Sequence, residues 1–145
     1  MAELVREIMI DATPETIWPF LVDSERHLEW IGTEADLDPR PGGVYRVLVH
    51  GQNPGVGEFV EVVPQERVVF TFGWDLPDHP IPAGSTTVEI SLHPEGEKTR
   101  VRLAHRGLPD DAVSDHTGGW DHFLGRLAIV ATGGDAGPDL SPGGN

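Results

Sequence analysis

Between residues 44 and 107 the chain repeats one pattern, in which apolar side chains alternate with polar ones over short segments. The segments cover residues 44–50, 57–63, 67–74, 86–94 and 99–107, and they are separated by turns at 51–55, 64–66 and 95–98 and by a proline-containing loop at 75–84. A period of two predicts β-strands with one apolar face, and the short connections predict antiparallel pairing. Such a sheet needs a cover for its apolar face, and the rest of the chain has to supply it.

The cover is predicted near the C-terminal end. From residue 111 to 132 apolar residues recur at helical spacing, which predicts a helix about 33 Å long at 1.5 Å per residue. Ahead of the sheet, residues 4–11 form a predicted strand, Thr13 and Pro14 start a short helix, and residues 24–30 form a second one. We therefore predict an α+β fold, in which a curved antiparallel sheet wraps around a long C-terminal helix, with two short helices after the first strand. A single domain is expected at residues 1–132, followed by a flexible Gly/Pro-rich tail at 133–145.

The composition excludes several classes of partner. There are 24 acidic and 10 basic residues, for a formal net charge of −14, and so acidic a surface repels nucleic-acid phosphates and anionic lipid headgroups. Cysteine is absent, which excludes disulfides and thiolate metal sites. The sequence shows neither the layout of a signal peptide nor a long apolar run. We expect a cytoplasmic protein, a monomer or homodimer, with no nucleic-acid or membrane partner and no metal or cofactor.

Two adjacent glycines, Gly118 and Gly119, interrupt the predicted long helix. Each costs a helix about 1 kcal/mol relative to alanine. One interpretation is that they allow close approach to the sheet, or a bend that opens a cavity beside it, so that Trp120 forms a wall or gate. The alternative is that the pair only relieves packing and that Trp120 belongs to the core.

The space between a curved sheet and its helix is a natural ligand pocket. The candidate ligand-binding residues are mostly aromatic or imidazole side chains expected near this space: Trp30, Tyr45, Phe70, Phe72, Trp74, His105, His116, Trp120 and Leu124. Of these, Tyr45, Trp74 and Trp120 each have a polar tip beside a large apolar body, which suits a flat, partly polar ligand. His105 is predicted to point inward, either as a general base or ligand anchor or as a structural residue. His116 is either at the pocket mouth or solvated.

Glu58 and Glu61 are the other candidates for acid–base chemistry. They lie three residues apart in one predicted strand, so the period of two places them on opposite faces and one of them inward. An inward carboxyl would be the better catalytic candidate. No catalytic residue is assigned from spacing alone.

Motifs along most of the chain are similar to those of one superfamily. They read ATPETIW (12–18), EWIG (29–32), PGG (41–43), GEFVEVVPQERVVFTF (57–72), and Gly119 and Trp120 followed by Leu124 and Leu127. In this order, over residues 3–132, they resemble the START-like (SRPBCC) superfamily with its birch-pollen-allergen helix-grip fold. Within it, they resemble the branch of proteins like the activator homologue of the heat-shock-protein-90 ATPase. The resemblance implies an internal apolar cavity.

The expected function is binding of an apolar or aromatic small molecule in this cavity, for transport, sequestration or sensing. One alternative is a cyclase- or hydrolase-like enzyme that uses a cavity histidine or glutamate as general acid–base. The other is a partner-binding regulator of the co-chaperone type. A binding protein is preferred, because no acid–base pair can be named from the sequence.

Overall fold

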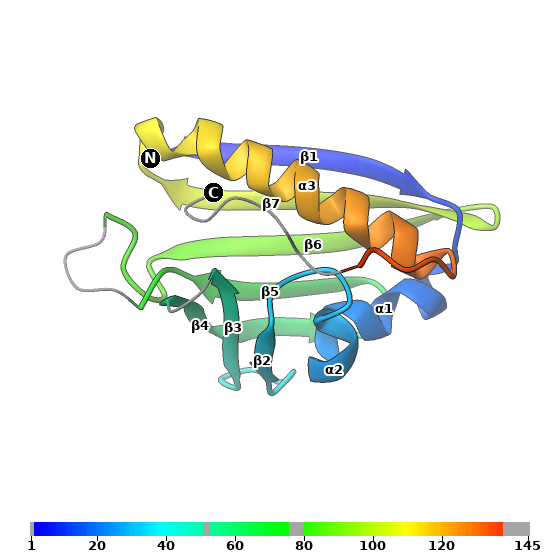
Figure 1. Ribbon diagram of the computed structural model, residues 1–145, viewed down its shortest axis with the longest axis horizontal. Coiled ribbons are helices and arrows are strands. Elements are labelled where there is room, and N and C mark those ends of the chain that lie inside the picture. Colours follow the sequence, from blue (N-terminus) through cyan, green and yellow to red (C-terminus); the bar gives the residue numbers. More distant parts are fainter. Residues whose placement is uncertain (1, 51–52, 76–79, 138–145) are drawn as a thin grey trace.

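The computed structural model describes residues 2–50, 53–75 and 80–137, which form one seven-stranded antiparallel sheet and three α-helices (Figure 1). The strands are β1 (Ala2–Ile10), β2 (Glu34–Leu37), β3 (Val44–His50), β4 (Asn53–Val63), β5 (Arg67–Phe72), β6 (Thr86–Glu95) and β7 (Lys98–Leu108). The helices are α1 (Pro14–Val22), α2 (Ser24–His27) and α3 (Val113–Ala131), and the 3-10 turn η1 (Asp110–Ala112) leads into α3. The order across the sheet is β1-β7-β6-β5-β4-β3-β2.

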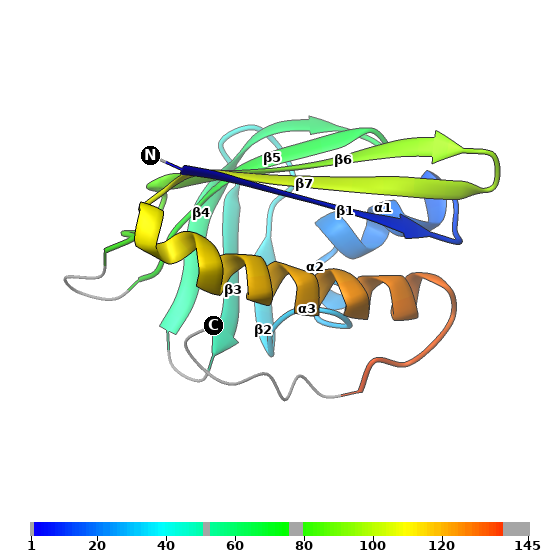
Figure 2. The ribbon, with the colours of Figure 1, turned by 90° about the horizontal axis from the view of Figure 1, so that it is seen from above.

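The sheet curves around α3, as Figure 2 shows most clearly. The long helix runs beneath β1, β7 and β6, while β2, β3 and β4 bend down beside it and α1 and α2 fill the opposite end. The core lies in this concavity, where buried residues alternate along each central strand. It is built from the inward side chains Val68, Phe70, Phe72, Val88, Ile90, Leu92, Val101 and Leu103 and from Trp120, Phe123, Leu124 and Leu127 of α3. The predicted helix-grip fold is confirmed.

Side-chain caps define the two short helices. The Thr13 hydroxyl accepts a hydrogen bond from the backbone N–H of Thr16 (3.4 Å) at the start of α1. Asp23 ends α1 and caps α2, because its carboxylate accepts from the N–H groups of Glu25 (2.9 Å) and Arg26 (3.3 Å). The chain therefore turns sharply between the helices, which places both at one end of the sheet.

The structure differs most from the prediction at α2, β2 and the start of β4. α2 ends at His27 rather than residue 30, because the chain then turns so that two side chains reach back to the carbonyl of Phe20. β2 was not predicted, since its sequence EADL buries only Leu37 and the strand forms by pairing with β3. The turn predicted at 51–55 is wrong for residues 53–55, which belong to β4. Residues 51–52 of that turn, and 76–79 of the predicted loop, lie outside the described ranges.

Two arginines tie α3 to the elements around it. On the exposed side, Arg6 of β1 forms a bidentate ion pair with Asp121 (2.7 and 2.9 Å). On the buried side, Arg126 donates to the carbonyl oxygens of Trp30 (2.9 Å), Ala136 (3.1 Å) and Gly137 (2.9 Å). The guanidinium thus holds both the segment after α2 and the segment that follows α3. The predicted tail begins at residue 133, and its described part, residues 133–137, includes these last two contacts.

Candidate functional site

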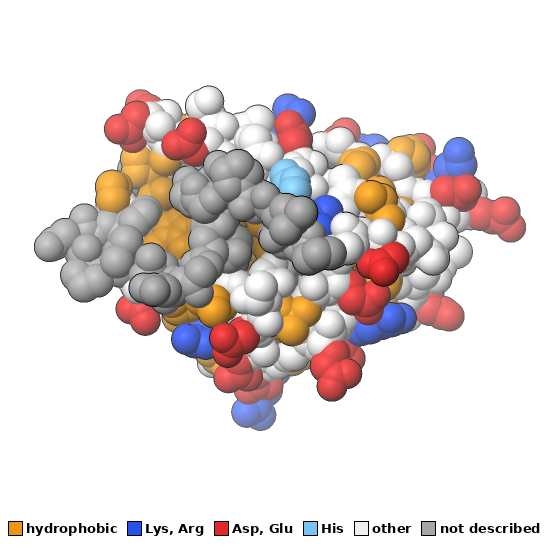
Figure 3. Space-filling model, viewed as in Figure 1, with side chains coloured by type: hydrophobic (Ala, Val, Ile, Leu, Met, Phe, Trp, Pro, Cys, Tyr) orange, Lys and Arg blue, Asp and Glu red, His pale blue; other side chains and the backbone are white. Residues whose placement is uncertain are grey.

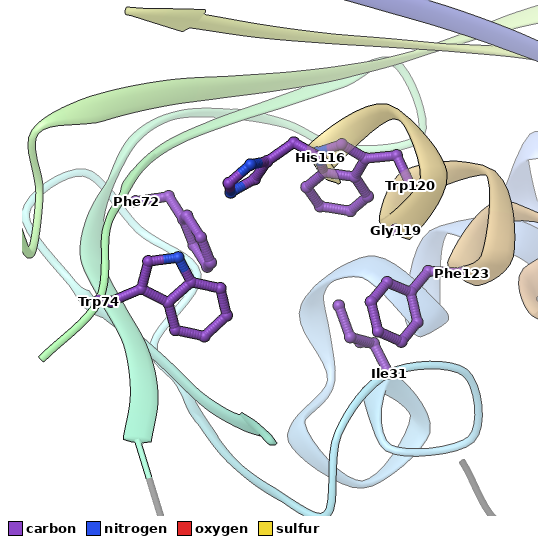
Figure 4. Close-up of a pocket in the computed structure, with 7 residues that line it drawn as sticks. All are labelled: Ile31, Phe72, Trp74, His116, Gly119, Trp120 and Phe123. Atoms are coloured by element: carbon purple, nitrogen blue, oxygen red, sulfur yellow. The ribbon is translucent and has the colours of Figure 1, made fainter. Parts of the chain in front are cut away.

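A small apolar pocket lies between the first half of α3 and the end of β5 (Figure 4). It is lined by Ile31, Phe72, Trp74, His116, Gly119, Trp120 and Phe123. Its cavity volume is about 30 Å³. A cavity that holds one water molecule has a volume of roughly 10–15 Å³. Pockets that hold whole drug-sized ligands have volumes of about 300–1,000 Å³. The pocket therefore has room for one end of a small molecule.

The helical repeat of α3 supplies one wall. His116, Gly119, Trp120 and Phe123 follow at spacings of three and four residues, which places them on one face of the helix. Gly119 lines the pocket without contributing a side chain. Gly118 points elsewhere: it is exposed, and a Cβ there would meet nothing within 4 Å. α3 is continuous across both glycines, and Gly118 does not approach the sheet.

The opposite wall comes from the end of β5, where the chain is tightly packed. The Phe72 and Trp74 rings meet edge to face, with centroids 5.2 Å apart and planes at 79°. A Cβ at Gly55 would overlap the Phe72 ring, and one at Gly73 would overlap the backbone of Pro82. These glycines permit close contacts that fix where both aromatic rings stand.

His105 lies behind this pocket as the centre of a hydrogen-bond relay. The Thr86 hydroxyl donates to the carbonyl of Phe72 (2.6 Å), so its oxygen accepts from His105 Nε2–H (2.8 Å). The indole N–H of Trp120 donates to His105 Nδ1 (3.0 Å). Burial, together with repulsion from nearby His116, lowers the pKa of His105 to about 3. The imidazole is therefore neutral near pH 7 and both of its nitrogens are occupied.

This geometry gives His105 a structural role. From β7, its ring connects Trp120 of α3 with the backbone of Phe72 on β5, through the hydroxyl of Thr86 on β6. Trp120 and Phe72 belong to opposite walls of the pocket. The prediction that His105 points inward is confirmed, since it is fully buried. A general base needs a free nitrogen aimed at a substrate. The relay leaves none, because each ring nitrogen already has a protein partner.

A second buried relay lies deeper in the core, around His27. The carbonyl of Phe20 accepts from His27 Nδ1–H (2.8 Å) and from the indole N–H of Trp30 (2.7 Å). The Tyr45 hydroxyl donates to His27 Nε2 (3.1 Å). Burial lowers the pKa of His27 to about 4 and raises the pKa of Tyr45 above its ordinary value. The polar tips of Trp30 and Tyr45 are thus bound within the protein rather than presented to a ligand.

The other candidates divide between the pocket, the core and the outer surface. Phe72, Trp74, His116 and Trp120 line the pocket. Phe70 stacks on Tyr45 at 3.9 Å between centroids, and both fill the core, as does Leu124. His116 donates from Nδ1 to the carbonyl of Ala112 (2.9 Å), which orients its ring beside that of His105.

Neither glutamate reaches the concavity. The pairing of β4 with β5 shifts register between Phe59 and Glu61, which makes Val60 the extra, exposed residue of a β-bulge. The bulge breaks the alternation, so Glu58 and Glu61 both lie on the outer face of the sheet, and the prediction that one points inward is wrong. Glu61 pairs there with Arg67.

Four important residues were not among the sequence candidates: Ile31, Phe123, His27 and Arg126. Phe123 falls on the same helical face as Trp120, so the period of α3 contains the signal for it. Arg126 was detectable as a charge at the edge of the apolar stripe of that helix. Ile31 and His27 give no comparable signal, because their positions depend on the turn after α2. Within the described ranges, no three histidine, aspartate or glutamate side chains are arranged to hold a metal ion.

Comparison with known proteins gives the chain a family context. The family described as "Activator of Hsp90 ATPase homolog 1-like protein" matches residues 11–132. The AHSA1-like protein of Rhizobium etli is 43% identical over 99% of this chain and 90% of that chain, with a TM-score of 0.76. The Aha1 dimer of Colwellia psychrerythraea is 19% identical over 92% of this chain and 98% of that chain, with a TM-score of 0.80. DynU16, a protein in the dynemicin biosynthetic locus, is 23% identical over 92% of this chain and 49% of that chain, with a TM-score of 0.78.

The last two similarities, below 25% identity, show the fold alone. A comparison with curated proteins found no match. None of the helices in the described part of the chain has the length and apolarity that crossing a lipid bilayer requires.

Proposed function

Since the chain belongs to the family of Activator of Hsp90 ATPase homolog 1-like proteins, with the START-like (SRPBCC) helix-grip fold, we propose that it binds one end of an apolar or aromatic small molecule in the pocket between α3 and β5. The observation that carries this proposal is the lining itself. Five of its seven residues are large apolar or aromatic side chains, drawn from three separate parts of the chain. Among the described residues, these side chains enclose a space that a ligand end can enter.

The driving force is burial of apolar ligand surface, worth about 25 cal/mol per Å². A ligand end that buries about 100 Å² would gain roughly 2.5 kcal/mol from this source. Orientation would come from the rings: Trp74 is half-buried at the rim, while Trp120 is held from behind by His105. The rest of the molecule would remain outside the pocket.

Binding is favoured over catalysis by the arrangement of the polar groups. The His105 nitrogens are both occupied, and Glu58 and Glu61 lie on the far side of the sheet.

The test uses the two glycines of α3 as a matched pair. Gly119→Ala adds a methyl group at the pocket, whereas Gly118→Ala adds one where a Cβ meets nothing within 4 Å. Both changes improve helix propensity by about 1 kcal/mol, so stability effects are shared. The probe is N-phenyl-1-naphthylamine, a neutral aromatic dye whose fluorescence rises in apolar sites.

We expect saturable dye binding by the wild type and by Gly118→Ala, and binding at least tenfold weaker by Gly119→Ala. A tenfold loss corresponds to about 1.4 kcal/mol. Equal binding by the two alanine variants would refute the assignment of the pocket. Absence of saturable binding by the wild type would refute the function.

A further inference from the structure

We propose that the end of the ligand that enters this pocket is cationic, an N-methylated ammonium group or the edge of a flat aromatic cation. The inference rests on the proposed function and specifies its ligand class. It follows from three properties of the pocket, namely the faces of its rings, the charges around it and its size.

The rings are arranged as perpendicular pairs. Phe72 and Trp74 meet at 79°, and across the pocket Trp120 and Phe123 meet at 73° with centroids 6.5 Å apart. Figure 4 shows the two pairs on opposite sides of one space. The face of an aromatic ring is the negative part of its quadrupole, so a cation among four such rings is attracted wherever it contacts a ring face.

The hydrogen bonds behind the wall reinforce this orientation. The indole N–H is the positive edge of Trp120, and it is turned away from the pocket into its bond with His105. The carbon part of the ring is what remains to face a ligand. His116 likewise directs its Nδ1–H to the carbonyl of Ala112 rather than into the pocket.

The charges around the pocket also favour a cation. No lysine or arginine is among the described residues that line it. Asp75 follows Trp74 directly, and Asp110, Asp111 and Asp115 cluster at the start of α3, all of them exposed. In Figure 3 acidic side chains border the hydrophobic area beside this end of the helix. With a net charge of −14, the field of the protein draws cations toward this end and repels anions.

The size of the pocket fits a small methylated group better than a whole ring system. About 30 Å³ admits the tip of a ligand while the remainder stays in water, which suits a compact cation on a longer molecule. A bare ammonium or guanidinium needs several hydrogen-bond acceptors to replace its hydration, whereas the described lining is mainly apolar and aromatic. Methyl groups on the nitrogen spread its charge and let it contact ring faces directly.

The test compares two probes of the same shape. Choline carries a trimethylammonium group, and 3,3-dimethyl-1-butanol has carbon in place of the nitrogen. Binding to the full-length protein is followed by NMR through the indole N–H signals of the tryptophans. We expect choline to bind at least tenfold more tightly at low salt. This preference should shrink as ionic strength rises from about 10 mM to about 150 mM, because the acidic field is screened.

Two tryptophan variants test whether the preference for choline arises in the pocket. Trp74→Leu keeps the rim apolar but removes a ring face, so it should lose most of the preference for choline while it still binds the neutral alcohol. Trp18→Leu, on the partly buried face of α1 outside the pocket, should keep the wild-type preference.

The outcomes separate this inference from the function on which it rests. Equal affinity for the two probes, or tighter binding of the alcohol, would overturn the cationic ligand while leaving an apolar binding pocket in place. A choline preference unchanged in Trp74→Leu would overturn it as well. If neither probe binds and N-phenyl-1-naphthylamine does not bind either, both proposals fail.

Discussion

The two buried histidines predict a specific acid sensitivity. His27 and His105 are each neutral in the fold, with pKa values lowered to about 4 and about 3, mainly by burial. In the unfolded chain each recovers an ordinary pKa of about 6.5. Between these limits the unfolded state binds more protons than the folded state. Stability therefore falls as the pH is lowered below 6.5, and the loss continues until the folded pKa is reached.

The magnitude follows from linkage. For each pH unit below 6.5, each histidine lowers the free energy of unfolding by about 1.4 kcal/mol. At pH 5 the loss is therefore about 2 kcal/mol per histidine. Together His27 and His105 should therefore remove about 4 kcal/mol of unfolding free energy between pH 7 and pH 5. That is a large part of the roughly 5–15 kcal/mol that stabilises a typical domain.

The assay is urea unfolding at pH 7, 6 and 5 at constant ionic strength, on the wild type and on His27→Gln and His105→Gln. Each variant should be less stable than the wild type at pH 7, because a relay is disturbed, yet should lose about 2 kcal/mol less between pH 7 and pH 5. Gly118→Ala, which changes no titratable group at an exposed position of α3, should retain the wild-type slope. Comparing slopes removes the contribution of the carboxylates, which all variants share. If the two relay variants show the wild-type slope, the histidines are not held neutral by the fold.

Three further predictions concern stability and are measured by thermal and urea unfolding. Gly118→Ala should stabilise the protein by about 1 kcal/mol, since the site is helical and open; a loss would mean that the glycine has a role in the fold. Gly57→Ala should destabilise it by about 3 kcal/mol or more, because a Cβ there overlaps the backbone carbonyl of Thr71, and a neutral result would contradict this packing. Arg126→Lys should cost about 2–3 kcal/mol, because an ammonium cannot serve carbonyls on two separate segments; wild-type stability would show that these bonds contribute little.

The sequence was informative wherever a periodic pattern decides a structure. Alternation along residues 86–94 and 99–107 predicted β6 and β7 and the inward direction of His105, and the helical period predicted α3. These features depend on one face of an element being buried, which the order of residues records directly. The family motifs added the way in which the elements assemble.

Prediction from the sequence failed where a local irregularity sets the direction of a side chain, or where side-chain volumes set the size of a cavity. A single bulge residue, Val60, moved Glu61 to the outer face, and nothing in the alternation marks it. Tyr45 and Phe70 were predicted near a cavity and do lie in the concavity, but they stack on each other and fill it. How much space remains between sheet and helix depends on ring volumes from several strands at once, which no single segment encodes.

The position of β1 in the sheet has a consequence for biosynthesis. Among the described strands β1 pairs with β7 alone, and their register joins Ile10 to Thr99 and Leu4 to His105. A nascent chain therefore has an unpaired N-terminal strand until the ribosome has released almost the entire domain, and such distant pairing slows folding. Glu3, Arg6 and Glu7 interrupt the apolar residues of that strand. Charges at these positions discourage association with other unfinished chains, so the same side chains that border the finished sheet also protect the polypeptide while it is being made.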